Sequence, residues 1–226
     1  MRTVLHGTMY NGIRLSQSKK NYQGFYVEIL QMIELLLKGM IRRHSEVFFV
    51  RFDLRYPAWS SSIYPNNNDL VKKFVEAFIR KCKRKKYDPK YLWVRELSKK
   101  SGQFHYHFIL LLNADHIQNA YELILDYATK LWQRCLGIED GKGLVQLTES
   151  TENNYYYDDR YGGVKIRRYD KKNYQRVYEK CFESASDFAK RFSKGSSPCY
   201  VNEIGHSKML YIDRLMQRAC VSEYMR

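Results

Sequence analysis

The sequence predicts an α+β protein: a central antiparallel sheet with helices packed on one face and a polar site on the other. Three observations carry this prediction. Alternating and helical apolar patterns follow one another in the order β–α–β–β–α–β–β–α. Residues 91–97 and 103–112 are joined by a turn so short that they must pair antiparallel. Residues 103–112 are also apolar on both faces outside two histidines, which indicates a central strand.

The first 55 residues contain an arm, a helix and a strand. Residues 1–24 are polar and glycine-containing, and we expect a loosely held arm there. Residues 25–43 have the spacing of an amphipathic helix. Residues 47–55 alternate, so one side of this strand is apolar and the other should face a polar site. The second side carries Phe49, Arg51, Asp53 and Arg55.

The middle of the chain contains the hairpin and a helix on each side of it. Residues 56–68 carry two prolines and three asparagines and predict a loop. Apolar residues recur at i+4 in residues 69–86, which predicts a helix. The strands 91–97 and 103–112 follow. Residues 115–136 predict a second helix, which Gly137 ends.

The last third is more irregular. Short strands are expected at 143–149 and 164–169, separated by an acidic, tyrosine-rich loop at 149–163. Residues 171–194 have one apolar sector and predict a long helix. After Gly195 the pattern is weak until a short helix within the tail 209–226.

The net charge of +15 predicts a polyanionic partner, nucleic acid before an anionic membrane. The charge is concentrated in two blocks: residues 80–100 hold ten Lys/Arg against two acids, and residues 160–194 hold eleven against four. The many aromatic side chains add possible stacking surfaces for unpaired bases. Nucleic acid is therefore the favoured ligand, and the sequence sets no oligomeric state.

The cysteines and the start of the chain predict a cytoplasmic protein. The five cysteines are widely spaced and odd in number, which is typical of free thiols. Residues 1–6 lack the apolar segment of a signal peptide, and charges interrupt the apolar stretch at 25–41. We therefore expect no membrane association.

The hairpin carries the candidate metal site. His105 and His107 point the same way because side chains alternate along a strand. With Lys100-Ser101 as the turn, Glu96 lies opposite His105. Two imidazoles and a carboxylate leave open positions on a divalent ion, as a catalytic site requires. Two histidines in a buried strand are the simpler interpretation of the pair alone; the opposed glutamate and the basic surroundings favour the site.

Several stretches, in order, resemble the HUH endonuclease superfamily and, more narrowly, the inovirus-type gene-two family, also called the YagK/YfjJ C-terminal domain family. They are Tyr91-Leu-Trp-Val-Arg-Glu96, His105-Tyr-His-Phe-Ile-Leu-Leu-Leu-Asn113, Trp132-Gln-Arg-Cys-Leu-Gly137, Gly143-Leu-Val145, Ser184-Ala-Ser-Asp-Phe-Ala-Lys190 and Asn202-Glu-Ile-Gly-His-Ser-Lys208. The matches run through roughly residues 47–208. A histidine pair alone is a weak signal, whereas the ordered set is fairly specific.

The resemblance implies a replication-initiator-like fold with a ferredoxin-like core at residues 44–208, preceded by an arm and helix at 1–43. It implies a nickase of rolling-circle replication in a phage or mobile element, acting on single-stranded or hairpin DNA beside the host replication machinery. Glu96, His105 and His107 would then hold Mg²⁺ or Mn²⁺. Lys190 would lie near the phosphate that a tyrosine attacks.

The chain departs from the family at the nucleophile. Where the family pattern is close to Ser-Tyr-Leu-Ala-Lys, this sequence reads Ser186-Asp-Phe-Ala-Lys190. One interpretation is a deliberate, inactivating replacement of the tyrosine, and a second is a natural loss of transesterification with metal and DNA binding kept. Alternatively, Asp187 acts itself as a ligand or a base for water. Tyr169 or Tyr200 would need a different geometry to substitute.

Other residues are candidate nucleic-acid contacts. They are Arg51, Arg55, Trp59, Lys180, Lys194 and His206. Asp53 either lies near the metal or is a structural acid paired with Arg51 or Arg55. A catalytically inactive DNA-binding protein and an RNA-binding protein are the alternatives to a nickase.

Overall fold

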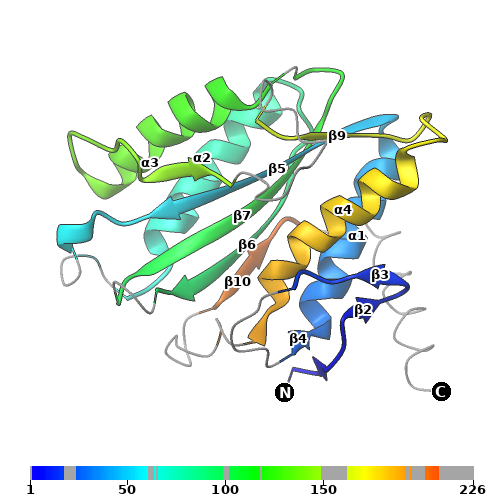
Figure 1. Ribbon diagram of the computed structural model, residues 1–226. Coiled ribbons are helices and arrows are strands. Elements are labelled where there is room, and N and C mark those ends of the chain that lie inside the picture. The colour runs from blue at the N-terminus through cyan, green and yellow to red at the C-terminus, as the bar shows by residue number, and fades with distance from the viewer. Residues whose placement is uncertain are drawn as a thin grey trace.

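The computed structural model describes residues 2–17, 24–60, 64, 66–98, 102–117, 119–148, 162–191, 194 and 202–208. Among these residues, six strands form one antiparallel sheet (Figure 1). They are β5 (Glu46–Arg55), β6 (Lys90–Leu97), β7 (Phe104–Asn113), β8 (Val145–Leu147), β9 (Val164–Arg167) and β10 (Ile204–His206). Short strands β1 (Val4–Leu5), β2 (Met9–Tyr10), β3 (Ile13–Arg14) and β4 (Phe25–Tyr26) form two small ribbons.

The sheet has the order β10-β6-β7-β5-β8, with β9 also paired to β5. β7 lies between β6 and β5, so the predicted central strand is confirmed. β8 and β9 share the outer edge of β5, pairing with its second and first halves respectively. The α+β class and the central antiparallel sheet are confirmed.

Helices cover both faces of the sheet, whereas the sequence suggested one face only. α2 (Asp69–Arg84) and α3 (Thr129–Leu136) share a core with Phe52, Phe108 and neighbours on one face. α1 (Val27–Arg43) and α4 (Tyr174–Ser186) share a second core on the other face (Figure 1). Residues that alternate along β5 and β7 enter the two cores in turn. This two-sided burial explains why β7 is apolar on both faces.

The N-terminal residues are packed, not loosely held. Tyr10, Ile13 and Leu15 are buried in the core that α1 and α4 share, and the ring of Tyr10 stacks on Phe182. Glu34 on α1 accepts hydrogen bonds from this segment. The described residues of 1–43 therefore belong to the same core as the sheet.

Two predicted helices have different bounds. The predicted helix 115–136 begins late: residues 122–128 form a π-helix that continues into α3, and Gly137 ends it in the left-handed conformation, as predicted. The predicted helix 171–194 ends at Ser186, followed by the short 3-10 helix η3 (Asp187–Ala189). Lys190 then forms a bridge with Phe25, a long-range contact that follows the end of both helices.

The C-terminal region adds the unpredicted edge strand β10, which pairs with β6. The expected tail helix at 209–226 and most of the tyrosine-rich loop at 149–163 lie outside the described residues. Among the described residues, no helix has both the length and the apolar character needed to cross a bilayer.

Candidate metal centre

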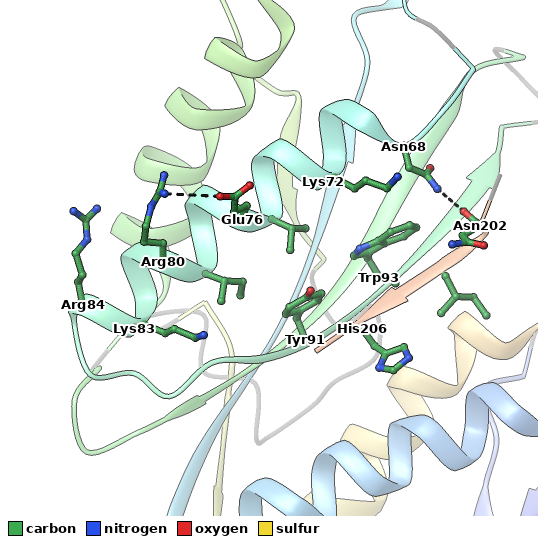
Figure 2. Close-up of a pocket in the computed structure, with 14 residues that line it drawn as sticks. Asn68, Lys72, Glu76, Arg80, Lys83, Arg84, Tyr91, Trp93, Asn202 and His206 are labelled. Atoms are coloured by element: carbon green, nitrogen blue, oxygen red, sulfur yellow. Dashed lines mark hydrogen bonds and ion pairs between the residues drawn. The ribbon is translucent and has the colours of Figure 1, made fainter. Parts of the chain in front are cut away.

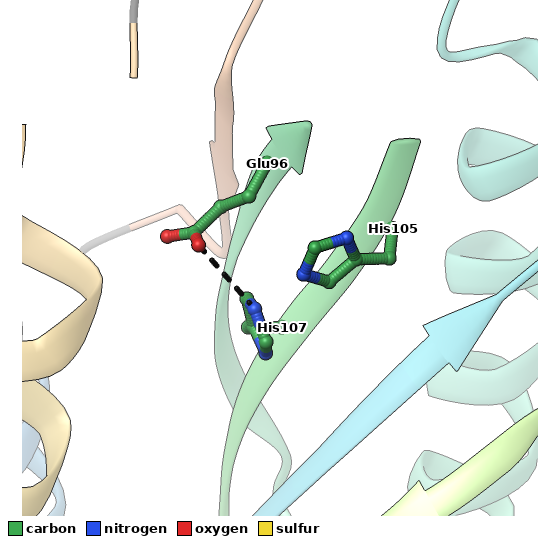
Figure 3. Close-up of side chains that lie close together, drawn as sticks. All are labelled: Glu96, His105 and His107. Carbon is green, nitrogen blue, oxygen red and sulfur yellow. Dashed lines mark ion pairs between the residues drawn. The ribbon is translucent and has the colours of Figure 1, made fainter. Parts of the chain in front are cut away.

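The hairpin brings the three predicted ligands together (Figure 3). Glu96 on β6 lies opposite His105 on β7, and Val94 lies opposite His107, so the predicted register is confirmed. One ligand atom from each of Glu96, His105 and His107 lies within 4.8 Å of the others. The two imidazole rings are 4.6 Å apart and nearly perpendicular. The cluster is on the sheet face that α1 and α4 cover, beyond the end of α4.

Asp53 fixes the orientation of His107. The two residues are paired across β5 and β7, and Asp53 Oδ1 lies 2.5 Å from His107 Nδ1. The other ring nitrogen of His107, Nε2, lies 3.5 Å from Glu96 Oε2. Burial opposes the charge on His107, but the two carboxylates outweigh it and raise its pKa to about 9. A carboxylate that holds the far nitrogen of a ligand histidine is the usual support for a metal site.

Asp53 also pairs with Arg55, whose guanidinium lies 3.3 Å from Oδ2. The sequence left open whether Asp53 lies near the metal ligands or pairs with an arginine, and the structure shows both. Burial favours neutral Asp53, but His107 and Arg55 together lower its pKa. Asp53 is thus a charged, buried support for the cluster.

At pH 7 His105 is neutral and Glu96 is negatively charged. Burial, reinforced by the charge of His107, lowers the pKa of His105 to about 4, so its imidazole is neutral at pH 7. Burial opposes ionisation of Glu96, but His107 and Lys194 prevail and lower its pKa well below the usual value. A neutral imidazole and an ionised carboxylate are the forms that ligate metals.

Lys194 belongs to the site, whereas the sequence predicted it to be a nucleic-acid contact. Its side chain has no exposed surface, and Nζ lies 2.5 Å from Glu96 Oε1. The predicted helix would have put Lys194 on an open DNA-facing side. Instead the helix ends before Lys194, whose ammonium lies next to β6 and compensates the charge of the Glu96 carboxylate.

The residues after α4 close one side of the cluster. The buried ring of Phe188 lies 5.8 Å from the ring of His107. The guanidinium of Arg51 lies over Phe188 at 5.0 Å and donates to the carbonyl oxygen and hydroxyl of Ser184. Arg51 is therefore largely engaged with the end of α4, and its role as a DNA contact stays a prediction.

Asp187, at the expected tyrosine position, is held by a set of local contacts. It pairs with Lys190, accepts a 3.0 Å hydrogen bond from Ser16 Oγ and lies 3.8 Å from Arg51. Burial opposes its charge, but Lys190 and Arg51 outweigh this and lower its pKa. Lys190 Nζ also lies 3.2 Å from Ser16 Oγ. Sequence reasoning missed Ser16 because nothing local links the N-terminal segment to this helix end.

The other candidate contacts occupy different places. Arg55, partly exposed, lies opposite His105, and Trp59 is 66% exposed just beyond the end of β5. Lys180 is exposed on α4 and pairs with Glu183, and His206 is exposed on the edge strand β10. Arg55 and Trp59 thus lie at the cluster end of the sheet, while DNA contact by any of the four stays a prediction.

Two tyrosines in the described part of the chain, Tyr169 and Tyr178, lie away from the cluster. The hydroxyl of Tyr169 donates to Glu46, seven residues before Asp53 on β5, so about 23 Å of strand separates it from the cluster. Tyr178 is buried in the core of α1 and α4. Tyr200 lies outside the described residues.

The donor set fits a divalent ion. Two imidazoles and one carboxylate converge from two adjacent strands, with Asp53 behind His107. Imidazole nitrogen favours Mn²⁺ over Mg²⁺, which prefers oxygen ligands throughout. Lys194 and protonated His107 both neutralise Glu96, so an ion bound here would displace the proton of His107 Nε2 and take over its part of that role.

Comparison with known families identifies the family of this chain. No match was found among curated proteins. The YagK/YfjJ C-terminal domain family matches residues 8–207, which includes the packed N-terminal segment, the hairpin and β10. Because this match covers most of the sequence, the chain belongs to the YagK/YfjJ C-terminal domain family.

Proposed function

We propose that this chain is an HUH-type, metal-dependent domain that acts on single-stranded DNA, of the replication-initiator kind found in phages and mobile elements. The observation that carries the proposal is the convergence of Glu96, His105 and His107 on one sheet face, supported by Asp53. The net charge of +15 supports a polyanionic substrate.

The residues around the cluster suit a phosphodiester. Three carboxylates, Glu96, Asp53 and Asp187, lie among four cations. The cations are Lys194, Arg55, Lys190 and Arg51. A bound divalent ion would supply Lewis-acid help by withdrawing charge from the phosphoryl oxygens. Arg55 would contact an adjoining phosphate, and Trp59 offers a ring on which an unpaired base could stack.

A cleavage assay tests the proposal. A labelled, diverse pool of single-stranded and hairpin DNA is incubated with Mn²⁺ and the chain, and the products are resolved on a denaturing gel. We expect Mn²⁺-dependent processing, or a Mn²⁺-dependent shift in a parallel native gel, that the double substitution His105→Ala/His107→Ala abolishes. The matched control His6→Ala/His116→Ala removes two exposed histidines and should behave as the parent. Equal behaviour of the cluster variant and the parent would refute the metal assignment.

The second candidate is a DNA-binding protein of the same fold that does not form a covalent adduct. The observation that favours it is the binding of Asp187 by Lys190, Arg51 and Ser16. A carboxylate with a lowered pKa and these partners is a poor base, and it lacks the hydroxyl that transesterification needs.

Substitution at this position separates the two candidates. Asp187→Tyr restores the family residue, and Asp187→Phe is its control because it adds the same ring without the hydroxyl. A protein–DNA adduct with the tyrosine variant alone indicates an intact site that lacks its nucleophile. An adduct with the parent indicates another nucleophile, which peptide mapping would identify. Cleavage by the parent without an adduct would indicate hydrolysis and refute the binding-only candidate.

A further inference from the structure

A concave surface lies on the opposite face of the sheet from the cluster of Glu96, His105 and His107, between α2 and the edge formed by β6 and β10. Its volume is about 850 Å³. Tyr91 and Trp93 of β6 line one side, and Lys72 and Lys83 of α2 line the other (Figure 2). We call this surface the α2 groove. No residue of the cluster lines it, so it is a separate candidate site.

The floor of the α2 groove is apolar and partly aromatic. Tyr91, Val75 and Ile79 are partly exposed, and Trp93 lies beneath Gly205 of β10. A side chain at Gly205 would force the indole or the strand to shift, because its Cβ would lie 2.2 Å from the ring. The absence of a side chain at Gly205 thus allows the indole of Trp93 to lie against the backbone of β10, next to the groove.

The wall of the α2 groove carries cations. Lys72, Ile79 and Lys83 lie within about 40° of one another around the helix, because each residue turns by about 100°. Lys83 has no ion-pair partner among the described residues, and Lys72 lies 3.8 Å from an exposed Asp69 carboxylate. Such a long, exposed pair is worth little and does not occupy the ammonium. The two lysines are therefore available to an anionic ligand.

The spacing of the two lysines suits a nucleic-acid strand. They are eleven positions apart in the sequence, which is about 16 Å along the helix axis. That length corresponds to about five stacked nucleotides at about 3.4 Å each. Apolar groups between the cations suit a single strand, whose unpaired bases can contact aromatic and aliphatic side chains. A duplex would present only its phosphates to this surface.

The groove and the cluster lie close enough for one strand to reach both. Trp93 and Glu96 point to opposite faces of β6 and are about 10 Å apart along it. β10 is the only strand beyond β6 at this edge of the described sheet. We propose that the α2 groove binds a single DNA strand through Lys72 and Lys83. The neighbouring nucleotides of the same DNA strand would pass around the β10 edge and reach the cluster. The choice of DNA as ligand rests on the proposed function.

Equilibrium binding tests this inference without any metal. Labelled single-stranded DNA of mixed sequence and the corresponding duplex are titrated in EDTA at several salt concentrations, and fluorescence anisotropy reports binding. Lys72→Ala/Lys83→Ala removes the two groove cations. Lys171→Ala/Lys172→Ala is the matched control: it removes two exposed lysines from the turn before α4 and changes the net charge equally. All four side chains are exposed, so both variants should fold.

The groove variant should bind the single strand roughly 25-fold more weakly than the parent at about 0.1 M salt, if two counterion-releasing contacts are lost. The slope of log K against log salt should fall by about 1.4 for the same reason. The control and the duplex should change much less.

Unchanged single-strand binding by the groove variant, or equal weakening in the control, would overturn the inference while leaving the proposed function intact. An equal loss for the duplex would also overturn it, because the groove would then accept a duplex. If the parent binds no DNA, the proposed function itself fails, and DNA is no longer the ligand of the groove.

Discussion

Replacement of Asp53 by asparagine should weaken metal binding even though Asp53 is not one of the three candidate ligands. Asp53 Oδ1 lies 2.5 Å from His107 Nδ1, and this contact directs Nε2 toward Glu96. Asparagine keeps the shape of the side chain but removes the charge that polarises the imidazole. Loss of such a supporting carboxylate typically lowers metal affinity by about 10- to 100-fold. That corresponds to about 1.4–2.7 kcal/mol at 25 °C.

A calorimetric Mn²⁺ titration measures this effect. Asp115→Asn is the matched control, since it removes an exposed carboxylate that is not part of the cluster. Arg55→Gln separates the two roles of Asp53: it removes the 3.3 Å ion pair but leaves the contact with His107. We expect Arg55→Gln to retain most of the affinity. Parent-like affinity in Asp53→Asn, or an equal loss in Arg55→Gln, would refute the supporting role.

Three further substitutions test other parts of the structure. Lys194→Met leaves Glu96 buried without its ammonium, so urea unfolding should show a loss of about 3 kcal/mol, and Mn²⁺ should restore part of it; no loss would contradict the buried pair. Asp88, paired with Arg43 and His44, has a lowered pKa because these partners outweigh its burial. Its contribution, about 0.5–1 kcal/mol for a partly exposed pair, is present above the unfolded pKa and is lost as the pH falls through the folded value. Parent and Asp88→Asn should therefore differ at pH 7 and converge in acid, and a constant difference would disprove the linkage. Gly205→Ala should lower the thermal midpoint of unfolding, because the new methyl group would clash with the ring of Trp93. A midpoint equal to that of the parent would show that the ring does not lie against β10.

The cluster was predictable because its geometry is local. Side-chain alternation and a short turn place Glu96, His105 and His107 together, and both features are visible in the sequence. The alternation of β5 likewise directed Asp53 to the polar side. Its contact with His107 needed the pairing of β5 with β7, which the sequence did not specify.

The surroundings of the cluster depend on contacts between distant segments. The apolar pattern of residues 171–194 fits a helix throughout, yet α4 ends at Ser186 and the chain bridges to Phe25 at Lys190. That exit places Phe188 beside His107 and Lys194 on Glu96. Propensity cannot reveal such a tertiary override.

The N-terminal segment and β10 were missed for a related reason. Residues 2–17 have too few apolar residues to show a period, although three of them fill a core position each: Tyr10, Ile13 and Leu15. β10 has three residues with a glycine at its centre, and so short a strand has no detectable alternation. The N-terminal segment is stabilised by its packing on α1 and α4, and β10 by its pairing with β6.

A Mn²⁺ titration followed by electron paramagnetic resonance tests the central claim most directly, because the signal of the free aqueous ion disappears on binding. The account predicts that the parent binds one Mn²⁺ per cluster and that His105→Ala/His107→Ala loses this binding, while His6→Ala/His116→Ala keeps it. Equal Mn²⁺ binding by the cluster variant and the parent would contradict the account, since the ion would then lie elsewhere in the chain.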